Sequence, residues 1–232
     1  TANTAYTRGK MVENGCYEQL IRIVPESLIA SEYDGVDGSS RIPQSVLTVG
    51  RLEEKKGHTY ALRAIAKIRE FFPDLRYYMV GSGTLDKDLR DQATALGILD
   101  ICDFVGSCTG EKVKEFYGTC EVFTLPSVTA SNGDKEGQGL VIQEAQICGM
   151  PVVTTRHNGI PDGLLDGETG YLVEEADVDA LADKLKLLLE NEQLRRSFGK
   201  KGKTFVSSKY DIAVITKTLE VCYNEVLETT AR

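Results

Sequence analysis

The chain has 232 residues, of which 41% are hydrophobic and 27% are charged, and its formal net charge is -8. This composition is ordinary for a soluble globular protein, and the length suits one α/β domain with a large core or two small domains. The negative charge argues against nucleic acid or an anionic membrane surface as the main partner, and no apolar run is long enough to span a bilayer.

Residues 1–40 differ in character from the rest of the chain. A helix is predicted around residues 6–14 and a strand around residues 21–24, and the polar, glycine-rich residues 31–40 predict a long loop. The first residues lack the apolar core of a signal peptide, and no initiator Met is present. We therefore expect the chain to begin inside a longer protein, with residues 1–40 as a lead-in or interdomain connection.

From residue 44 onward, short apolar runs alternate with amphipathic stretches. Strands are predicted at residues 45–49, 76–80, 101–105, 121–125, 151–154 and 170–173. Helices are predicted at residues 59–71, 85–96, 110–117 and 139–148, followed by a helical tail at residues 177–190, 192–207 and 212–227. This alternation predicts an α/β fold with a Rossmann-like, doubly wound parallel sheet. Residues 41–210 are expected to form that domain and residues 211–232 a C-terminal helix.

A group of cations follows the first predicted strand of this sheet. Gly50 ends the strand, Arg51 follows it, and Lys55, Lys56 and Gly57 open the next helix. Arginine can bind phosphate oxygens through two parallel hydrogen bonds, and lysine adds a point charge. Phosphate binding at this strand end is one interpretation. Pairing with the neighbouring acidic residues 53 and 54 on the surface is the other.

The segment of residues 134–150 joins a glycine-containing loop to an apolar helix and carries Glu136 and Glu144. Gly137 and Gly139 precede the helix start, where bare backbone N–H groups can bind a phosphate. At about 1.5 Å of rise per residue, the two carboxylates are expected on the order of 10 Å apart, each able to accept a hydrogen bond from a hydroxyl group. In the alternative, Glu136 is an acidic residue stabilised at the helix start by the helix dipole, and Glu144 is a solvated helix residue. Two other glutamate pairs share this spacing, so the spacing alone does not indicate a site.

No other motif in the sequence points to a different kind of site. The run Val-Gly-Ser-Gly-Thr at residues 80–84 lacks the third glycine of a dinucleotide fingerprint, so a turn that shapes the ligand edge is expected. No P-loop, G-x-S-x-G or H-E-x-x-H motif occurs. With two histidines, His58 and His157, and six scattered cysteines, no zinc site is expected. Most of the thiols are expected to be buried, in a reducing cytoplasm.

Taken in order, these motifs resemble one family. They are Gly50-Arg51-Leu52, Lys56-Gly57, Val80-Gly81-Ser82-Gly83, Phe104-Val105-Gly106, Pro126-Ser127, and the segments 136–145, 149–153 and 166–173. The series resembles retaining glycosyltransferases of family four, and more narrowly the bacterial exopolysaccharide enzymes among them. The resemblance extends from about residue 44 to residue 205, with a weaker match at residues 6–36.

The resemblance implies a GT-B architecture, in which two Rossmann-like domains face each other across a cleft, and this chain matches only the C-terminal, donor-binding half. The catalytic residues that it implies are Arg51 and Lys56, which would neutralise the donor diphosphate, and Glu136, which would hold hydroxyl groups of the donor sugar. The donor-binding positions are the helix-start backbone of Gly139, Leu140 and Val141, Glu144 at the ribose hydroxyls, Val105 and Gly106 beside the base, and Gly50 and Gly137. No metal and no other cofactor is implied, because cations and amides would stabilise the leaving diphosphate.

The chain also departs from the family pattern. An Asn-Gly turn is usual after the proline at position 25, where this chain continues Glu-Ser-Leu-Ile. The usual Gly-Gly and Glu near the phosphate edge are replaced by Asn158-Gly159 and Asp162. The N-terminal acceptor domain is absent from this sequence.

The function implied by the resemblance is transfer of a hexose from a UDP-, GDP- or ADP-sugar to a hydroxyl acceptor on a glycan or lipid-linked glycan. The isolated chain is expected to bind nucleotide without transferring sugar. The alternatives are a non-catalytic donor-binding subunit of a split transferase and a GT-B sugar-nucleotide epimerase or hydrolase. We expect a cytoplasmic protein with no nucleic-acid partner, and any contact with the inner membrane would be made by the missing domain. Base, sugar, acceptor and oligomeric state stay open.

Overall fold

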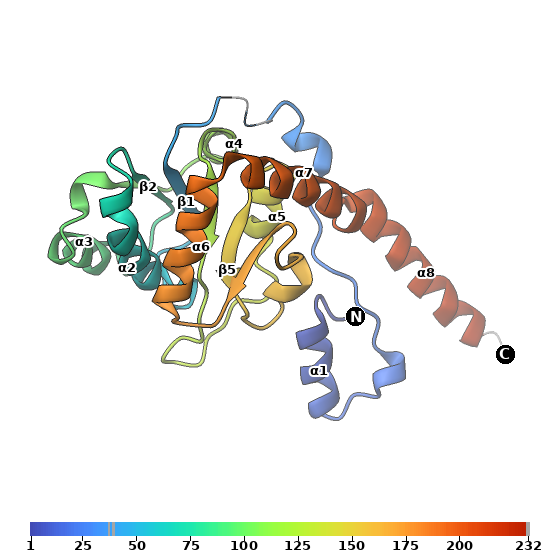
Figure 1. Ribbon diagram of the computed structural model, residues 1–232. Coiled ribbons are helices and arrows are strands. Elements are labelled where there is room, and N and C mark those ends of the chain that lie inside the picture. The colour runs from blue at the N-terminus through green and yellow to red at the C-terminus, as the bar shows by residue number, and fades with distance from the viewer. Residues whose placement is uncertain (37, 39, 231–232) are drawn as a thin grey trace.

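The computed structural model describes residues 1–36, 38 and 40–230. Its centre is a parallel sheet of six strands (Figure 1), with the spatial order β3-β2-β1-β4-β5-β6. The strands are β1 (Ser45–Val49), β2 (Arg76–Val80), β3 (Cys102–Gly106), β4 (Val122–Leu125), β5 (Val152–Thr155) and β6 (Gly170–Val173). The chain reverses its direction of winding between β1 and β4. Open α/β sheets bind ligands at the carboxyl ends of strands beside such a switch point.

Helices cover both faces of the sheet. One face carries α2 (His58–Ile68), α3 (Asp86–Ala95) and α6 (Val178–Glu190), and the other carries α4 (Gly110–Thr119) and α5 (Leu140–Ile147). The helix α7 (Glu192–Lys209) contacts both cores, with Phe198 in the first and Val206 in the second. Successive strand residues point to opposite faces, so Val46 packs in the first core and Leu47 in the second. The strands are therefore buried on both sides, as their near-continuous apolar runs predict.

These elements confirm the predicted fold class, a Rossmann-like doubly wound parallel sheet. Each predicted strand is present, with bounds that differ by at most one residue at either end. The helices also match the predicted ones, although the predicted helix 59–71 ends as a short 3₁₀ turn, Arg69–Phe71. The remaining 3₁₀ turns are Glu18–Leu20, Ala30–Tyr33, Glu54–Lys56, Leu99–Ile101 and Ile160–Gly163.

The N-terminal segment corrects two predictions. The predicted helix is α1 (Ala5–Glu13), but residues 21–24 form no strand, because only an isolated bridge joins Ile23 to Ala2. An apolar run without a second strand beside it cannot build a ladder. The predicted loop at residues 31–40 begins as a 3₁₀ turn that buries Tyr33 in the core. Residues 37 and 39 lie outside the described part.

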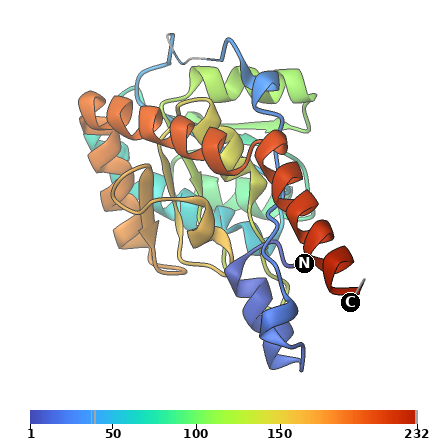
Figure 2. The same ribbon diagram turned by 90° about the vertical axis from the view of Figure 1, so that its right-hand side faces the viewer.

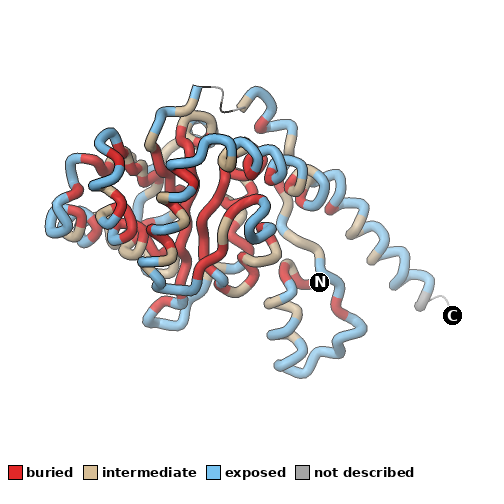
Figure 3. Tube along the Cα trace, viewed as in Figure 1, coloured by how far each residue is buried: buried red, intermediate tan, exposed pale blue. Residues whose placement is uncertain are grey.

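The last helix, α8 (Ile212–Thr230), extends away from the sheet toward the N-terminal segment (Figures 1 and 2). Its start is packed, with Ile215 buried, and farther along Val221 and Tyr223 are exposed (Figure 3). An ion pair of 3.0 Å between Arg22 and Glu225 joins it to the N-terminal segment. Within the described residues, no helix combines the length and apolarity that crossing a membrane requires.

All six cysteines are free thiols. Cys102, Cys120 and Cys148 are buried, as predicted, and burial raises the pKa of each thiol to about 12. Cys16 is exposed, and the other two are partly exposed. The prediction that most of the thiols are buried is therefore wrong, because several lie on helices and turns at the surface.

Candidate functional site

The carboxyl ends of β1, β2 and β3 meet through glycines. Gly81 has a φ of +140°, and a Cβ atom there would lie 2.0 Å from the carbonyl oxygen of Gly50. The Gly81 N–H donates to the carbonyl of Gly106 over 2.9 Å. The absence of side chains thus lets three strand ends approach closely. The turn at residues 80–84 shapes the edge of the sheet, as predicted from the sequence.

A second close approach joins the loop after β1 to the end of β4. Gly57 has a φ of +70°, and a Cβ atom there would lie 1.8 Å from the carbonyl oxygen of Pro126. The backbone N–H of Val128 donates to the carbonyl of Lys55 over 2.9 Å. Two segments about seventy residues apart in sequence are therefore fixed side by side at the switch point, as expected for a ligand-binding edge.

The cations of the β1–α2 loop have different partners. Lys56 forms an ion pair with Glu136, and both side chains are largely buried, at 13% and 14% exposed. Lys55 pairs with Asp134 over 3.0 Å. Arg51, with 67% of its side chain exposed, pairs with Glu53 over 2.8 Å, as the surface alternative predicted. The structure therefore brings Lys56 and Glu136 together and leaves Arg51 at the rim.

Four contacts fix Glu136 in its loop. Besides the ion pair with Lys56, its carboxylate accepts from the Gly137 N–H over 3.2 Å. Its backbone N–H donates to Nε2 of His157 over 3.1 Å, and its carbonyl accepts from Nδ2 of Asn158 over 3.0 Å. Because backbone and side chain are both held, the carboxylate has a defined direction before any ligand arrives.

His157 is a residue that sequence reasoning considered only as a zinc ligand. It is fully buried, and its Nδ1 lies 2.6 Å from the carboxylate of Glu175. Since Nε2 accepts the Glu136 N–H, these partners assign the ring proton to Nδ1. Burial of Glu175 opposes its ionisation, but hydrogen bonds from His157 and the Thr129 N–H outweigh it and lower the pKa of that carboxyl. His157 thus positions Glu136. Its place just after a predicted strand was the signal available in the sequence.

The start of α5 offers free backbone donors. Gly139 caps the helix with a φ of +72°, and its carbonyl accepts from the Ile142 N–H over 2.8 Å. Across the described residues, the N–H groups of Gly139, Leu140 and Val141 have no hydrogen-bond partner. Unpaired amides at a helix N-terminus favour an anion. The predicted phosphate-binding backbone is therefore available for that role.

Glu144 lies inside α5 among tyrosines. The hydroxyl of Tyr117 donates to its carboxylate over 2.8 Å, and Tyr33 lies close enough to interact with it. Burial, followed by the charge of Glu144, raises the pKa of Tyr117 well above its ordinary value. Glu144 is therefore not simply a solvated helix residue, and Tyr117 is a partner that the sequence analysis missed. The expected separation of the Glu136 and Glu144 carboxylates stays a prediction.

Val105 and Gly106 lie at the end of β3, on the outer side of this edge. Gly106 has a φ of +78°, and the hydroxyls of Ser82 and Ser107 lie 2.7 Å apart beside it. Two strands separate these residues from β4. They extend the edge along the sheet without touching the Lys56–Glu136 pair.

The residues that depart from the family pattern hold the N-terminal segment against this edge. Asp162 accepts a hydrogen bond of 2.6 Å from the Ala5 N–H at the start of α1. Gln138 exchanges two hydrogen bonds of 2.8 Å with the backbone of Glu26. The loop between Glu136 and α5 is thus tied to a segment more than one hundred residues away.

His58 gives a pH prediction for this edge. It is buried, and its Nε2 lies 3.0 Å from the carbonyl of Arg51, to which a neutral ring donates. Burial lowers the pKa of His58 from 6.5 to about 4. Between pH 6.5 and about 4, His58 therefore binds a proton in the unfolded chain but stays neutral in the folded chain. Stability should fall by up to about 3 kcal/mol as the pH drops through this range.

Urea unfolding at pH values on either side of this range measures the effect. The His58→Gln variant keeps an N–H donor and does not titrate. The difference in pH dependence between wild type and variant therefore separates the contribution of His58 from those of the carboxylates and of His157. Equal pH dependence in both proteins would exclude a buried neutral His58.

Comparison with protein families places the chain. The family model described as Glycosyl transferases group 1 matches residues 37–205. The amylovoran biosynthesis glycosyltransferase AmsK of Erwinia amylovora is 32% identical over 185 residues, which are 79% of this chain and 45% of that protein. The GDP-mannose-dependent alpha-(1-6)-phosphatidylinositol monomannoside mannosyltransferase of Mycolicibacterium smegmatis is 33% identical over 159 residues, covering 68% and 42%. The chain spans less than half the length of these curated relatives.

Solved structures share the fold. The crystal structure of Anabaena Alr3699/HepE in complex with UDP aligns with a TM-score of 0.85 and 21% identity over 97% of this chain and 63% of that one. The C-terminal domain of LpcC, a group 1 family glycosyl transferase from Francisella tularensis, aligns with a TM-score of 0.65 and 24% identity over 74% and 89%. The sheet is that of a GT-B Rossmann-like domain.

Proposed function

Since this chain belongs to the group 1 glycosyltransferase family, we propose that it is the donor-binding half of a retaining, metal-independent transferase. The enzyme would move a hexose from a nucleoside diphosphate sugar to a hydroxyl group of a glycan or lipid-linked acceptor. The observation that carries this proposal is one edge of the sheet where unpaired helix-start amides, a buried lysine and two oriented glutamates gather.

The diphosphate would bind at the start of α5. The N–H groups of Gly139, Leu140 and Val141 would donate to its oxygens, and Lys56 and Arg51 would neutralise its charge. As the bond to the sugar breaks, negative charge grows on the leaving diphosphate. Donors that are already oriented stabilise this charge without further rearrangement. Such an arrangement supplies the chemistry that a metal ion provides in other transferases.

The two carboxylates would bind the two ends of the donor. Glu136, held by His157 and Lys56, would accept from a hydroxyl of the sugar. Glu144, oriented by Tyr117, would accept from the ribose hydroxyls. Neither carboxylate is expected at the phosphates, because like charges repel. Val105 and Gly106 would border the base at the outer end of the edge.

The relatives named above support the transferase class. The relative from Erwinia amylovora is named as a biosynthesis glycosyltransferase and the mycobacterial relative is named for GDP-mannose, whereas Alr3699/HepE was solved with UDP. These names cover more than one base, so UDP-, GDP- and ADP-sugars all stay candidates. A reducing cytoplasm, and membrane contact through a domain outside this chain, belong to the same proposal.

Two other functions use the same edge. An epimerase or hydrolase of this architecture would release nucleotide without an acceptor, and product analysis on a longer protein that contains this chain separates it from a transferase. A non-catalytic subunit would supply the donor half to a second polypeptide. An upstream reading frame that continues into Thr1 would exclude that alternative.

The chain alone is expected to bind nucleotide and to transfer no sugar, because a GT-B acceptor site lies on the facing domain. Mixing the chain with a radiolabelled sugar nucleotide and a mixture of glycan and lipid-linked acceptors tests the second part. Labelled product would contradict this expectation. Nucleotide binding, measured separately by calorimetry, shows whether the donor half itself is intact.

A further inference from the structure

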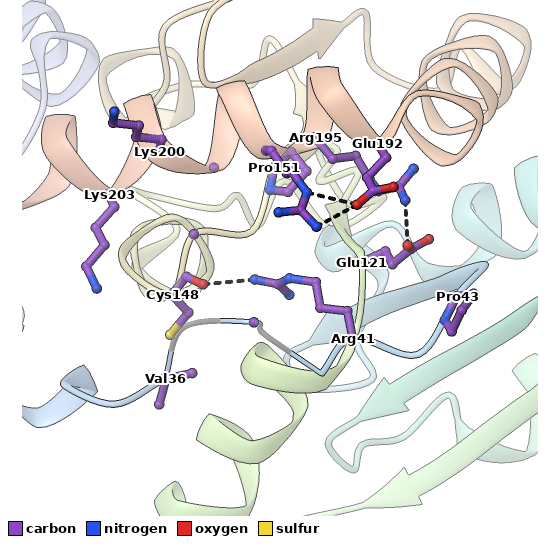
Figure 4. A pocket seen from close by; sticks show the side chains of 14 residues that line it. Val36, Arg41, Pro43, Glu121, Cys148, Pro151, Glu192, Arg195, Lys200 and Lys203 are labelled. Carbon is purple, nitrogen blue, oxygen red and sulfur yellow. Dashed lines mark hydrogen bonds and ion pairs between the residues drawn. The ribbon is translucent and has the colours of Figure 1, made fainter.

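A basic cavity lies at the opposite edge of the sheet from the proposed donor site (Figure 4). Its volume is about 900 Å³, within the range of roughly 300–1,000 Å³ typical of small-molecule sites. Pro43, Glu121 and Pro151 line it, and these residues lie just before β1, β4 and β5. The cavity is therefore at the amino ends of the strands. The strands, of four or five residues, separate the two edges by about 15 Å.

The cavity carries an excess of positive charge. Its cations are Arg41, Arg195, Arg196, Lys200 and Lys203. They face two lining carboxylates, Glu121 and Glu192. Three positive charges are thus left over in a concave site of a chain whose net charge is -8. Concave surfaces of one sign raise the local concentration of oppositely charged ligands.

The side chains that carry this excess lack anionic partners. Arg195 pairs with Glu121 over 2.5 Å, and Arg196 pairs with Glu192 over 2.6 Å. Within the described residues, Lys200 and Lys203 form no ion pair, and Figure 4 draws them on α7 beside the cavity without an interaction. The guanidinium of Arg41 donates to backbone carbonyls, among them that of Cys148 at 2.9 Å.

The order of residues in α7 keeps these cations on one stripe. Arg196 and Lys200 are four residues apart on α7. Arg195, Gly199 and Lys203 follow one another at the same spacing. Like charges at this spacing repel each other along a helix. Gly199 lets α7 approach the backbone of Gly149 closely, since a Cβ atom there would lie 2.1 Å from the carbonyl oxygen of Gly149. An anion bound in the cavity would reduce the repulsion between these cations.

We propose that this cavity is a second binding site, for an organic phosphate with two or more phosphate-type charges. A single carboxylate offers one negative charge, whereas each phosphate group carries about 1.5 to 2. Guanidinium groups also match phosphate oxygens geometrically. The proposal does not depend on the proposed function, because none of these residues belongs to the donor edge.

Calorimetric titration of the chain, saturated with UDP to fill the donor edge, with inorganic pyrophosphate tests the proposal. The Lys200→Gln/Lys203→Gln variant is expected to lose about tenfold or more in affinity, because it removes two charged donors. The control variant Lys201→Gln/Lys217→Gln removes the same charge. Lys201 pairs with Glu168 outside the cavity, and Lys217 lies on α8, so this control should change affinity less than about twofold.

Cosedimentation with phosphatidylcholine vesicles containing phosphatidic acid identifies the source of the phosphate. Pyrophosphate binding that depends on Lys200 and Lys203 supports a soluble ligand, and vesicle binding alone with the same dependence supports a lipid headgroup at the same site. Absence of both, or equal weakening in the control variant, would overturn the proposal. If UDP does not bind, GDP or ADP takes its place. If none of the three binds, the proposed function fails, and the titration is repeated in a Lys56→Met background so that only the cavity is measured.

Discussion

The Lys56→Met variant is expected to bind nucleoside diphosphates about 10- to 100-fold more weakly than wild type. Methionine keeps much of the apolar stem but removes the charge that would contact the diphosphate. Lys56 is 13% exposed, so its attraction to an anion is screened less than that of a surface lysine. Arg51→Ala should act in the same direction and more weakly, because that side chain is 67% exposed and paired with Glu53.

Lys55→Met is the matched control for this variant. Lys55 is adjacent in the same 3₁₀ turn and equally buried, at 14% exposed, but pairs with Asp134. Both variants lose one charge, so a loss confined to Lys56→Met assigns the contact to that lysine. Circular dichroism confirms that Glu136, left without its partner, has not unfolded the loop. Equal affinity in the two folded variants would remove Lys56 from the site.

Glu144→Ala is expected to lower nucleotide affinity by a similar factor, about 10- to 100-fold, because a carboxylate that accepts from two ribose hydroxyls contributes charge-assisted hydrogen bonds. The substitution also leaves the buried hydroxyl of Tyr117 with only a long contact of 3.5 Å to the carbonyl of Val141. Glu144→Gln therefore accompanies it, since glutamine retains an oxygen for Tyr117 and should lose less affinity. Calorimetry of both variants measures the effect.

A modified ligand makes this test specific for the ribose. The 2′,3′-dideoxy form of the nucleotide should bind wild type more weakly than the natural form does. Glu144→Ala should no longer distinguish the two. Continued discrimination by the alanine variant, or wild-type affinity in both folded variants, would exclude contact between Glu144 and the ribose.

The sheet and its ligand edge were predictable because their signals are local. Apolar runs of four or five residues define the strands, and glycines such as Gly50 and Gly81 follow them directly. In a parallel sheet the carboxyl ends of strands share one edge, so residues after different strands converge without knowledge of long-range contacts. Lys56 and Glu136 could be assigned to one edge for this reason.

The partners within the site were not predictable in the same way. The pairing of Lys56 with Glu136, rather than with Glu53 or Glu54, depends on the approach of Gly57 to Pro126. The role of His157 depends on contacts with Glu136 and Glu175, which lie in two other segments of the chain. These arrangements are decided by tertiary packing, which periodicity and propensity do not contain.

The same limit explains the elements that differ. The apolar residues around Ile23 have the composition of a strand, yet the bridge between Ile23 and Ala2 is isolated and belongs to no ladder among the described residues. The basic cavity combines a row of cations on α7 with the beginnings of three strands, and no local sequence motif predicts such a combination. Its cations are ordinary surface residues in the sequence and become a group only after α7 packs across the sheet.

Direct titration of the wild-type chain with UDP, GDP and ADP, and with their common sugar derivatives, tests the central claim. The account predicts that at least one of these nucleotides binds with one-to-one stoichiometry, and that the double variant Lys56→Met/Glu144→Ala abolishes this binding while remaining folded. Failure of all three nucleotides to bind, or undiminished binding to the folded double variant, would contradict the assignment of this edge as a sugar-nucleotide site.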